Sequence, residues 1–236
     1  KISLLSLLFF VFNMATAQQE ISTAYATQAT NMFAPLDKNR IPHKVLLDYG
    51  FEYTNLKAYN GTLSDSTVVD VPTLKHIYNT IFSSRVTSAT TGFINPNNFD
   101  SNWKNRTAGT ITVSGLYYKY NAFINDAINL GKVNFVNNQF QDKFVSGVWQ
   151  NPYQEFQAFA MAPAISKYEG LSFTVKIPST IFYSNYQSLV QSIQIDFGNG
   201  AGYVTVPFNQ NVTISYATEG VKTWKYKLNL TNGTSL

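Results

Sequence analysis

From Thr110 onward the chain is a series of short alternating segments separated by turn residues, and this pattern constrains the fold most. β-branched and aromatic residues alternate with polar ones, which is the period of a half-buried strand. Many short strands at regular intervals are typical of an antiparallel sandwich. The expected strands lie within 111–120, 132–136, 155–161, 171–177, 192–198, 203–208, 211–217 and 222–230. The sequence therefore predicts a mainly β protein with a minor helical part, an antiparallel β-sandwich preceded by a mixed N-terminal region.

One helix is expected in that N-terminal region, at about residues 70–84. Asp70 is a favourable N-cap, and Pro72 suits the first turn. The apolar residues that follow have the i, i+3, i+4, i+7, i+8 spacing of one helix face: Leu74, Ile77, Tyr78, Ile81 and Phe82. His76 lies off this face. No second metal ligand lies at a suitable spacing, so we expect a surface histidine.

The remaining organisation follows from local composition. Residues 18–40 are polar and aperiodic, which predicts a flexible lead-in. Residues 41–109 form a mixed region with the one helix, and within it 91–109 are rich in Asn, Gly and Pro and are expected to be a loop. A β-rich region is expected at 110–190, followed by a separate C-terminal module at 191–236.

Residues 1–17 have the three parts of a secretory signal peptide. Lys1 is basic, residues 4–12 are an apolar run, and Ala15, Thr16 and Ala17 end in the small residues that signal peptidase requires. The run is too short to span a bilayer as an anchor. We therefore expect export to the cell surface or medium, with no membrane span left after cleavage. The chain begins at Lys1, so at least one preceding residue is expected.

The composition suits an exported protein that depends on its core. There is no cysteine, which favours a bacterial source over a disulfide-bonded eukaryotic one and leaves no site for a lipid anchor. The net charge is only +4, without a run of Lys or Arg, so no nucleic-acid partner is expected. Polarity rests on Asn, Thr, Ser, Gln and Tyr, which suits exposed strand faces and contact with extracellular glycans.

The most specific motif is a glycine turn near the C-terminus. Asp196 precedes Gly198, Asn199 and Gly200, and a later strand ends at Tyr216. Glycine permits positive φ in a tight turn, and an Asp at its start can accept backbone N–H groups. The Tyr216 hydroxyl can bond back to the main chain. We expect Asp196, Gly198, Gly200 and Tyr216 to form a structural turn.

Residues 192–234 resemble the PKD (polycystic kidney disease) domain, an Ig-like sandwich. That family has a Trp-Asp-Phe-Gly-Asp-Gly turn, a later Tyr, a Glu-Gly or Pro-Gly turn and an alternating closing strand. Here Ile195 replaces the Trp and Asn199 replaces the second Asp. The resemblance implies that the first strand of the module comes from residues 171–177. It also implies a spacer, adhesion or presentation role in a larger surface protein.

The preceding part is similar to the N-terminal portion of long secreted proteins of Bacteroidota. The similarity lies in residues 41–61, 73–82 and 115–121. In those proteins such segments precede an Ig/PKD-like stretch and further domains, in some cases a hydrolase-like one. The resemblance implies that this chain is part of a longer protein. One alternative is therefore an N-terminal fragment of a secreted hydrolase.

No catalytic motif is present, so an enzyme is not expected and no catalytic or cofactor-binding residue is assigned. The G-x-S-x-G, H-E-x-x-H, P-loop and G-x-G-x-x-G patterns are absent, and only two histidines occur, His43 and His76. A pair of acids for glycoside hydrolysis stays open, because such acids need only meet in space. The candidates are Asp48, Glu52, Asp126, Asp142, Glu155 and Asp196.

Two binding alternatives complete the expectations. Tyr118, Trp149 and Tyr153 are candidates for stacking on sugars, which would make the chain a carbohydrate-binding accessory region. Core packing is the stronger expectation for such strand aromatics. Calcium at Asp196 is the only cofactor considered, and Asn199 disfavours it because calcium prefers several carboxylates. The expected function is thus a non-catalytic scaffold, spacer or adhesion region, with an extracellular glycan or another surface protein as partner.

Overall fold

The protein is built mainly from β-strands, several of them in antiparallel sheets, as the alternating segments predict. The computed structural model describes residues 25–88, 91–102 and 107–236. The chain forms two units, a larger one of residues 38–123 and 153–236 and a smaller one that contains residues 25–37 and 124–152. The expected signal peptide lies outside the described residues. Among the described residues, no helix has the length and apolar character needed to span a bilayer.

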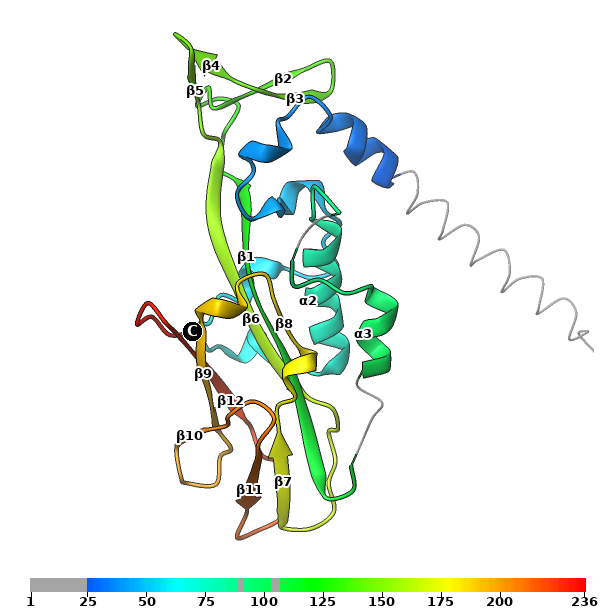
Figure 1. Cartoon of the computed structure of the whole chain (residues 1–236), viewed down its shortest axis with the longest axis vertical. Helices are drawn as coiled ribbons and strands as arrows, with labels where there is room; N and C mark the ends of the chain where they lie inside the picture. The colour runs from blue at the N-terminus through cyan, green and yellow to red at the C-terminus, as the bar shows by residue number, and fades with distance from the viewer. Residues whose placement is uncertain (1–24, 89–90, 103–106) are drawn as a thin grey trace, which may run out of the picture. The chain divides into compact units, whose positions relative to one another are not determined.

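The larger unit is organised around the long strand β1 (Thr110–Phe123) (Figure 1). Along one edge β1 pairs antiparallel with β6 (Tyr153–Pro163). Its other edge pairs in turn with β7 (Ser172–Lys176) and β8 (Phe182–Ser184), both parallel. β11 (Asn211–Ser215) then pairs antiparallel with β7, which gives the order β11-β7-β1-β6. The strand expected within residues 171–177 is therefore present as β7.

A second sheet of the larger unit has the order β10-β9-β12. Its central strand β9 (Val190–Asp196) pairs antiparallel with β10 (Tyr203–Thr205) and with β12 (Lys225–Leu230). The free edge of β12 is covered by the chain itself, because the amide and carbonyl of Leu236 both bond to Leu228 at 2.9 Å. The expected module at 191–236 thus takes β7 and β1 as further strands from outside that range.

β1 and β6 form a wall between two hydrophobic cores, because successive side chains of a strand point to opposite faces. One core lies on the helix side of the wall, and the other lies between the wall, β7, β11 and the second sheet. The helix-side core takes Leu116, Tyr118, Tyr120, Ala158, Ala160 and Ala162 from the wall. The other core takes Ile111, Val113, Tyr117, Phe159 and Met161.

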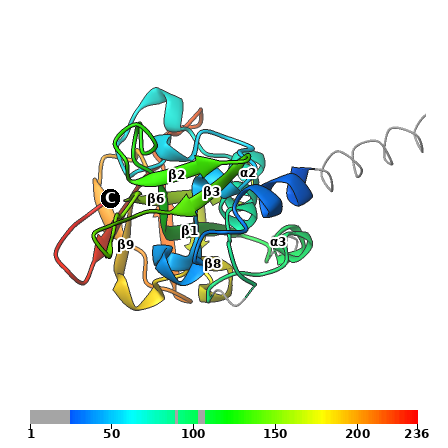
Figure 2. The ribbon, with the colours of Figure 1, turned by 90° about the horizontal axis from the view of Figure 1, so that it is seen from above.

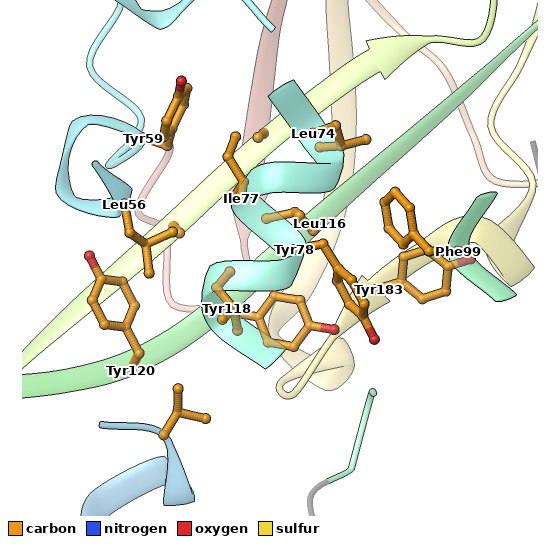
Figure 3. Close-up of a cluster of buried hydrophobic side chains, with 14 of the residues drawn as sticks. Leu56, Tyr59, Leu74, Ile77, Tyr78, Phe99, Leu116, Tyr118, Tyr120 and Tyr183 are labelled. Atoms are coloured by element: carbon orange, nitrogen blue, oxygen red, sulfur yellow. The ribbon is translucent and has the colours of Figure 1, made fainter. Parts of the chain in front are cut away.

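The helix-side core is closed by α2 (Val71–Ser83), the helix expected at about 70–84. Asp70 caps it, since its carboxylate accepts the Thr73 amide at 2.8 Å. The rings of Tyr78, Phe99, Tyr118 and Tyr183 gather beside this helix (Figure 3). The Tyr78 hydroxyl donates to the carbonyl oxygen of Ile94 and accepts its amide, and burial raises the pKa of Tyr78 to about 12. His76 is exposed, as expected.

The prediction of a loop at 91–109 is wrong in part, because this segment contains the helix α3 (Pro96–Asn102). Asn95 accepts the Asn97 amide at 2.9 Å, and Pro96 stands at the first helical position. Asn and Pro here start a helix instead of marking a turn. Short 3-10 turns supply most of the remaining regular structure: Lys38–Arg40, Pro42–Lys44, Leu47–Tyr49, Leu56–Ala58, Asp65–Thr67, Ser179–Ile181 and Gln187–Leu189.

The smaller unit contains two β-hairpins. β2 (Val133–Val136) pairs with β3 (Gln139–Asp142), the ribbon labelled in Figure 2. β4 (Phe144–Val145) pairs with β5 (Val148–Trp149). The expected β-rich region 110–190 is therefore interrupted, since residues 124–152 connect β1 to β6 but belong to this second unit.

The flexible lead-in expected at 18–40 is wrong for part of its described length. Residues 25–32 are helical, and Phe33 is buried. Its ring lies 5.0 Å from that of Phe140 on β3. Ala29 and Leu36 are buried as well, at the i, i+4 and i+7 positions that one helix face would give with Phe33, and this period was overlooked in the polar sequence around it.

Candidate functional site

The predicted glycine turn is present at the end of β9. Asp196 Oδ1 accepts the Gly198 amide at 2.9 Å. Gly198 and Gly200 have φ of +68° and +88°, a conformation that side-chain-bearing residues adopt at a cost. Asn199 Nδ2 donates to the carbonyl oxygen of Ser215 at the end of β11. The turn therefore joins the ends of two strands that belong to different sheets.

Tyr216 completes this turn as the sequence predicts. Its hydroxyl donates to the carbonyl oxygen of Phe197 at 2.8 Å, and partial burial raises its pKa. Trp224, which precedes β12, donates from Nε1 to the same hydroxyl at 2.7 Å and meets the buried Phe197 ring edge to face at 4.9 Å. Sequence reasoning had placed Trp224 only in the closing strand. The signal for its role was a Tyr and a Trp flanking the Gly220 turn.

The chemistry of this turn is structural. Asp196 is bonded to the backbone, and the Tyr216 hydroxyl both donates and accepts within the protein. A calcium site needs several oxygen ligands and usually more than one carboxylate. Among the described residues, no group of three His, Asp or Glu side chains is placed to hold a metal ion. Calcium at Asp196 would therefore need backbone and amide oxygens as its other ligands.

A second polar arrangement, which the sequence did not reveal, is the cluster of His43, Lys119, Glu155 and Tyr186, here called the His43 cluster. His43 Nδ1 lies 2.7 Å from the Tyr186 hydroxyl, and its Nε2 lies 2.7 Å from Glu155 Oε2. Lys119 Nζ lies 2.9 Å from the other oxygen of Glu155. The four residues are far apart in the sequence, so no local motif could indicate them.

Strand pairing and an unusual turn position this cluster. Lys119 and Glu155 come from the paired strands β1 and β6. The side chain of Asn185 accepts the Lys119 amide and donates to its carbonyl oxygen, which fixes the segment that carries Tyr186. His43 has φ of +58°, in the left-handed region that favours glycine. The hydrogen bonds of its ring to two other segments offset the cost of that backbone conformation.

The charged groups of the His43 cluster stabilise one another and join separate segments of the chain. The pKa of Glu155 is lowered overall. Partial burial alone would raise it, but the hydrogen bonds from Lys119 and His43 together have the larger effect. The hydrogen bond to Glu155 raises the pKa of Lys119. The His43 side chain is only 9% exposed, and both ring nitrogens have protein partners. The imidazole therefore joins three segments of the chain through its two nitrogens.

Four of the six candidate acids form hydrogen bonds to other groups of the protein. Asp48 accepts the Phe123 amide at 2.8 Å, and Asp142 accepts Trp149 Nε1 at 3.0 Å. Glu155 belongs to the His43 cluster, and Asp196 belongs to the glycine turn. Each of these four carboxylates thus has a hydrogen-bond partner within the fold, although burial raises the pKa of Asp48 and so opposes its ionised form.

The three aromatic residues proposed for sugar stacking do not form an exposed platform. Tyr118 and Tyr153 are 0% and 6% exposed, and the Tyr118 hydroxyl donates to the carbonyl oxygen of Gly92. Trp149 is half-buried and belongs to the smaller unit. The expectation fails because it assumed a solvated strand face, whereas β1 and β6 have a hydrophobic core on each face.

Comparisons with protein-family models, with curated proteins and with solved structures find no match to this chain.

Proposed function

We propose that this chain is a non-catalytic, β-rich region of an exported bacterial surface protein, with an Ig-like module that serves as a spacer or presentation scaffold. The observation that carries the proposal is the turn of Asp196, Phe197, Tyr216 and Trp224. Its polar groups bond to one another and to the backbone, which holds β9, β11 and β12 together. Such a turn provides rigidity at the point where the two sheets meet.

The strand order supports an Ig-like, PKD-like module. In Ig-like sandwiches the chain crosses repeatedly between two sheets. Here β7 and β11 pair in one sheet, whereas β9 and β12 pair in the other, so the chain crosses between the sheets as it runs from β7 to β9, β11 and β12. The inner faces of both sheets contribute side chains to one core, including Val175, Ile195, Ile214 and Leu228.

The export part of the proposal rests on residues 1–17 and is tested by expression in a bacterium with an added initiator Met. We expect the chain in the exported fraction, with Gln18 as the first residue by N-terminal sequencing. Replacement of both Ala15 and Ala17 with Phe should leave the chain uncleaved, since signal peptidase needs small residues there. An intact wild-type chain in the cytoplasm would refute export.

The scaffold part is tested by pulling single molecules of the exported chain from its two ends. A spacer should resist force in the Ig-like module, and Tyr216→Phe should lower the unfolding force of that module. The matched control is Tyr226→Phe, because the Tyr226 hydroxyl is buried and has no hydrogen-bond partner in the described part of the chain. Equal unfolding forces for the two variants would contradict the idea that the hydrogen bonds of the Tyr216 hydroxyl resist the applied force. Specific signals on a glycan array would favour carbohydrate binding in place of a scaffold.

A further inference from the structure

The smaller unit exposes a run of large apolar side chains at the end of the β4–β5 hairpin. We call residues 143–149 the β4–β5 tip. Phe144, Val145 and Val148 are 50%, 51% and 63% exposed, and every residue from 144 to 148 is exposed. Single exposed apolar residues are ordinary on protein surfaces, but a continuous run of them marks a binding surface.

The backbone of the tip presents apolar residues on both faces of the hairpin. Ser146 and Gly147 have φ of +49° and +79°, which makes a tight two-residue turn (Figure 1). Phe144 lies opposite Trp149, and Val145 lies opposite Val148. Because adjacent residues of a strand point to opposite faces, the aromatic pair lies on one face and the valine pair on the other. A strand pair that covers a core has one polar face, which this tip lacks.

The charge at the base of the tip is positive. Lys143 directly precedes β4, and among the described residues its ammonium group forms no ion pair. Lys132 lies nearby, with Nζ 3.4 Å from the side-chain oxygen of Gln150. The neighbouring carboxylate of Asp142 accepts hydrogen bonds from Trp149 Nε1 and from the Asp37 amide. The tip therefore combines apolar side chains with a cation and an occupied carboxylate.

This combination matches the cross-section of an anionic lipid bilayer. Apolar side chains gain free energy at the boundary between acyl chains and headgroups, and a Lys near the surface gains further from anionic lipid. A Trp at the base has the amphipathic ring that prefers this interface. A stable protein partner, including a second copy, buries about 800 Å² on each side. A tip of so few residues offers little of that area but suits reversible membrane contact.

We propose that the β4–β5 tip docks this protein onto anionic lipid surfaces. This goes beyond the spacer role, because it supplies a means of holding an exported protein at a membrane. The probe is the full chain after cleavage of residues 1–17, mixed with vesicles of phosphatidylcholine and phosphatidylglycerol at 70:30 or of phosphatidylcholine alone. The protein should sediment with the anionic vesicles, and less of it should do so at high salt, since salt screens the lysine term.

Two variants and a control connect binding to the tip. The double variant Val145→Ser/Val148→Ser should weaken vesicle binding about tenfold or more, because the valines no longer enter the bilayer. Lys143→Gln should reduce the preference for anionic vesicles about fivefold, because one of the two cations at the base of the tip is lost. Val221→Ser should bind as the wild type does, since Val221 is 98% exposed but lies in the larger unit.

Four results would overturn the proposal. The first is a wild-type chain that stays in the supernatant with both kinds of vesicle, and the second is a double variant that sediments like the wild type. The third is a dimer in solution that the double variant abolishes, which would make a second copy the occupant. The fourth is a lower unfolding temperature for the double variant than for Val221→Ser, which would place the valines within the protein's own packing.

Discussion

The Tyr216 hydroxyl donates to the carbonyl oxygen of Phe197 across 2.8 Å and so links the ends of β11 and β9, which belong to different sheets. The same hydroxyl accepts from Trp224 Nε1, at the start of the segment that leads into β12. A single oxygen atom therefore holds three strands of the larger unit in place.

Tyr216→Phe should lower the free energy of unfolding by about 1–3 kcal/mol, because it leaves a carbonyl and an indole N–H without their partner. Tyr226→Phe on β12 is the matched comparison. Its hydroxyl is buried and finds no hydrogen-bond partner among residues 25–88, 91–102 and 107–236, so its removal should leave the stability unchanged or raise it. Urea titrations of both variants measure the difference. Equal losses would show that the Tyr216 hydroxyl contributes nothing specific.

Substituting alanine for Gly198 and for Gly200 should distinguish the cost of backbone strain from the cost of a close contact. Gly200→Ala should cost about 1 kcal/mol, since φ is +88° but no atom lies within 4 Å of a new Cβ. Gly198→Ala should cost more, because its Cβ would lie 3.1 Å from the carbonyl oxygen of Thr223 in addition to the strain at +68°. Thermal unfolding ranks the two, and the reverse order would contradict this geometry.

Gly50→Ala tests close packing alone. The φ of Gly50 is −87°, which any residue adopts, but a Cβ there would lie 2.8 Å from the backbone of Ser84 at the end of α2. Overpacking of this kind costs about 1–3 kcal/mol, so the loss should exceed that of Gly200→Ala. Denaturant unfolding measures the difference. A neutral result would mean that the two segments separate more easily than the structure indicates.

Glu155→Gln should make stability less dependent on acid pH. The pKa of Glu155 is lowered by folding, so its contribution is present above the unfolded pKa and is lost as the pH falls through the folded pKa. The side chain is 51% exposed, so solvent screening limits the contribution at pH 7 to about 1 kcal/mol or less. The gap between variant and wild type should close between about pH 5 and pH 3. Glu219→Gln, at an exposed position, should show no such change.

Lys119 of the His43 cluster should make stability depend on alkaline pH. Its pKa is raised by the hydrogen bond to Glu155, so its contribution is present below the unfolded pKa and is lost as the pH rises through the folded pKa. Lys119→Met should therefore differ from the wild type at neutral pH and converge with it in strong alkali. Stability curves against pH, read from urea midpoints, check this. A constant gap over the whole range would attribute the effect to packing.

The elements that the sequence predicts are those with a local period. The longer strands and α2 follow from alternation and helical spacing, and the glycine turn follows from residues adjacent in the chain. The short strands β3, β4, β5 and β8 were not predicted, because two to four residues are too few to show an alternation. The His43 cluster could not be predicted, because His43 and Tyr186 are separated by 143 residues and meet only through the tertiary fold. Core packing was the stronger expectation for Tyr118 and is confirmed, but the burial of Tyr117 as well, on the opposite face of β1, was not predicted. Alternation shows that a strand has two faces, but it does not show that both are covered.

The wall of β1 and β6 also determines where the chain can tolerate insertions. If one of these strands shifted by one residue, its side chains would move from each core into the other. Both cores therefore favour the same register, in which Leu116 pairs with Ala160. An extra residue inside either strand should therefore prevent the chain from folding. The connection between them, residues 124–152, lies beyond the paired positions and can lengthen without changing the register. The connection is thus the place where this chain accommodates a separate unit without disturbing the register of its central strands.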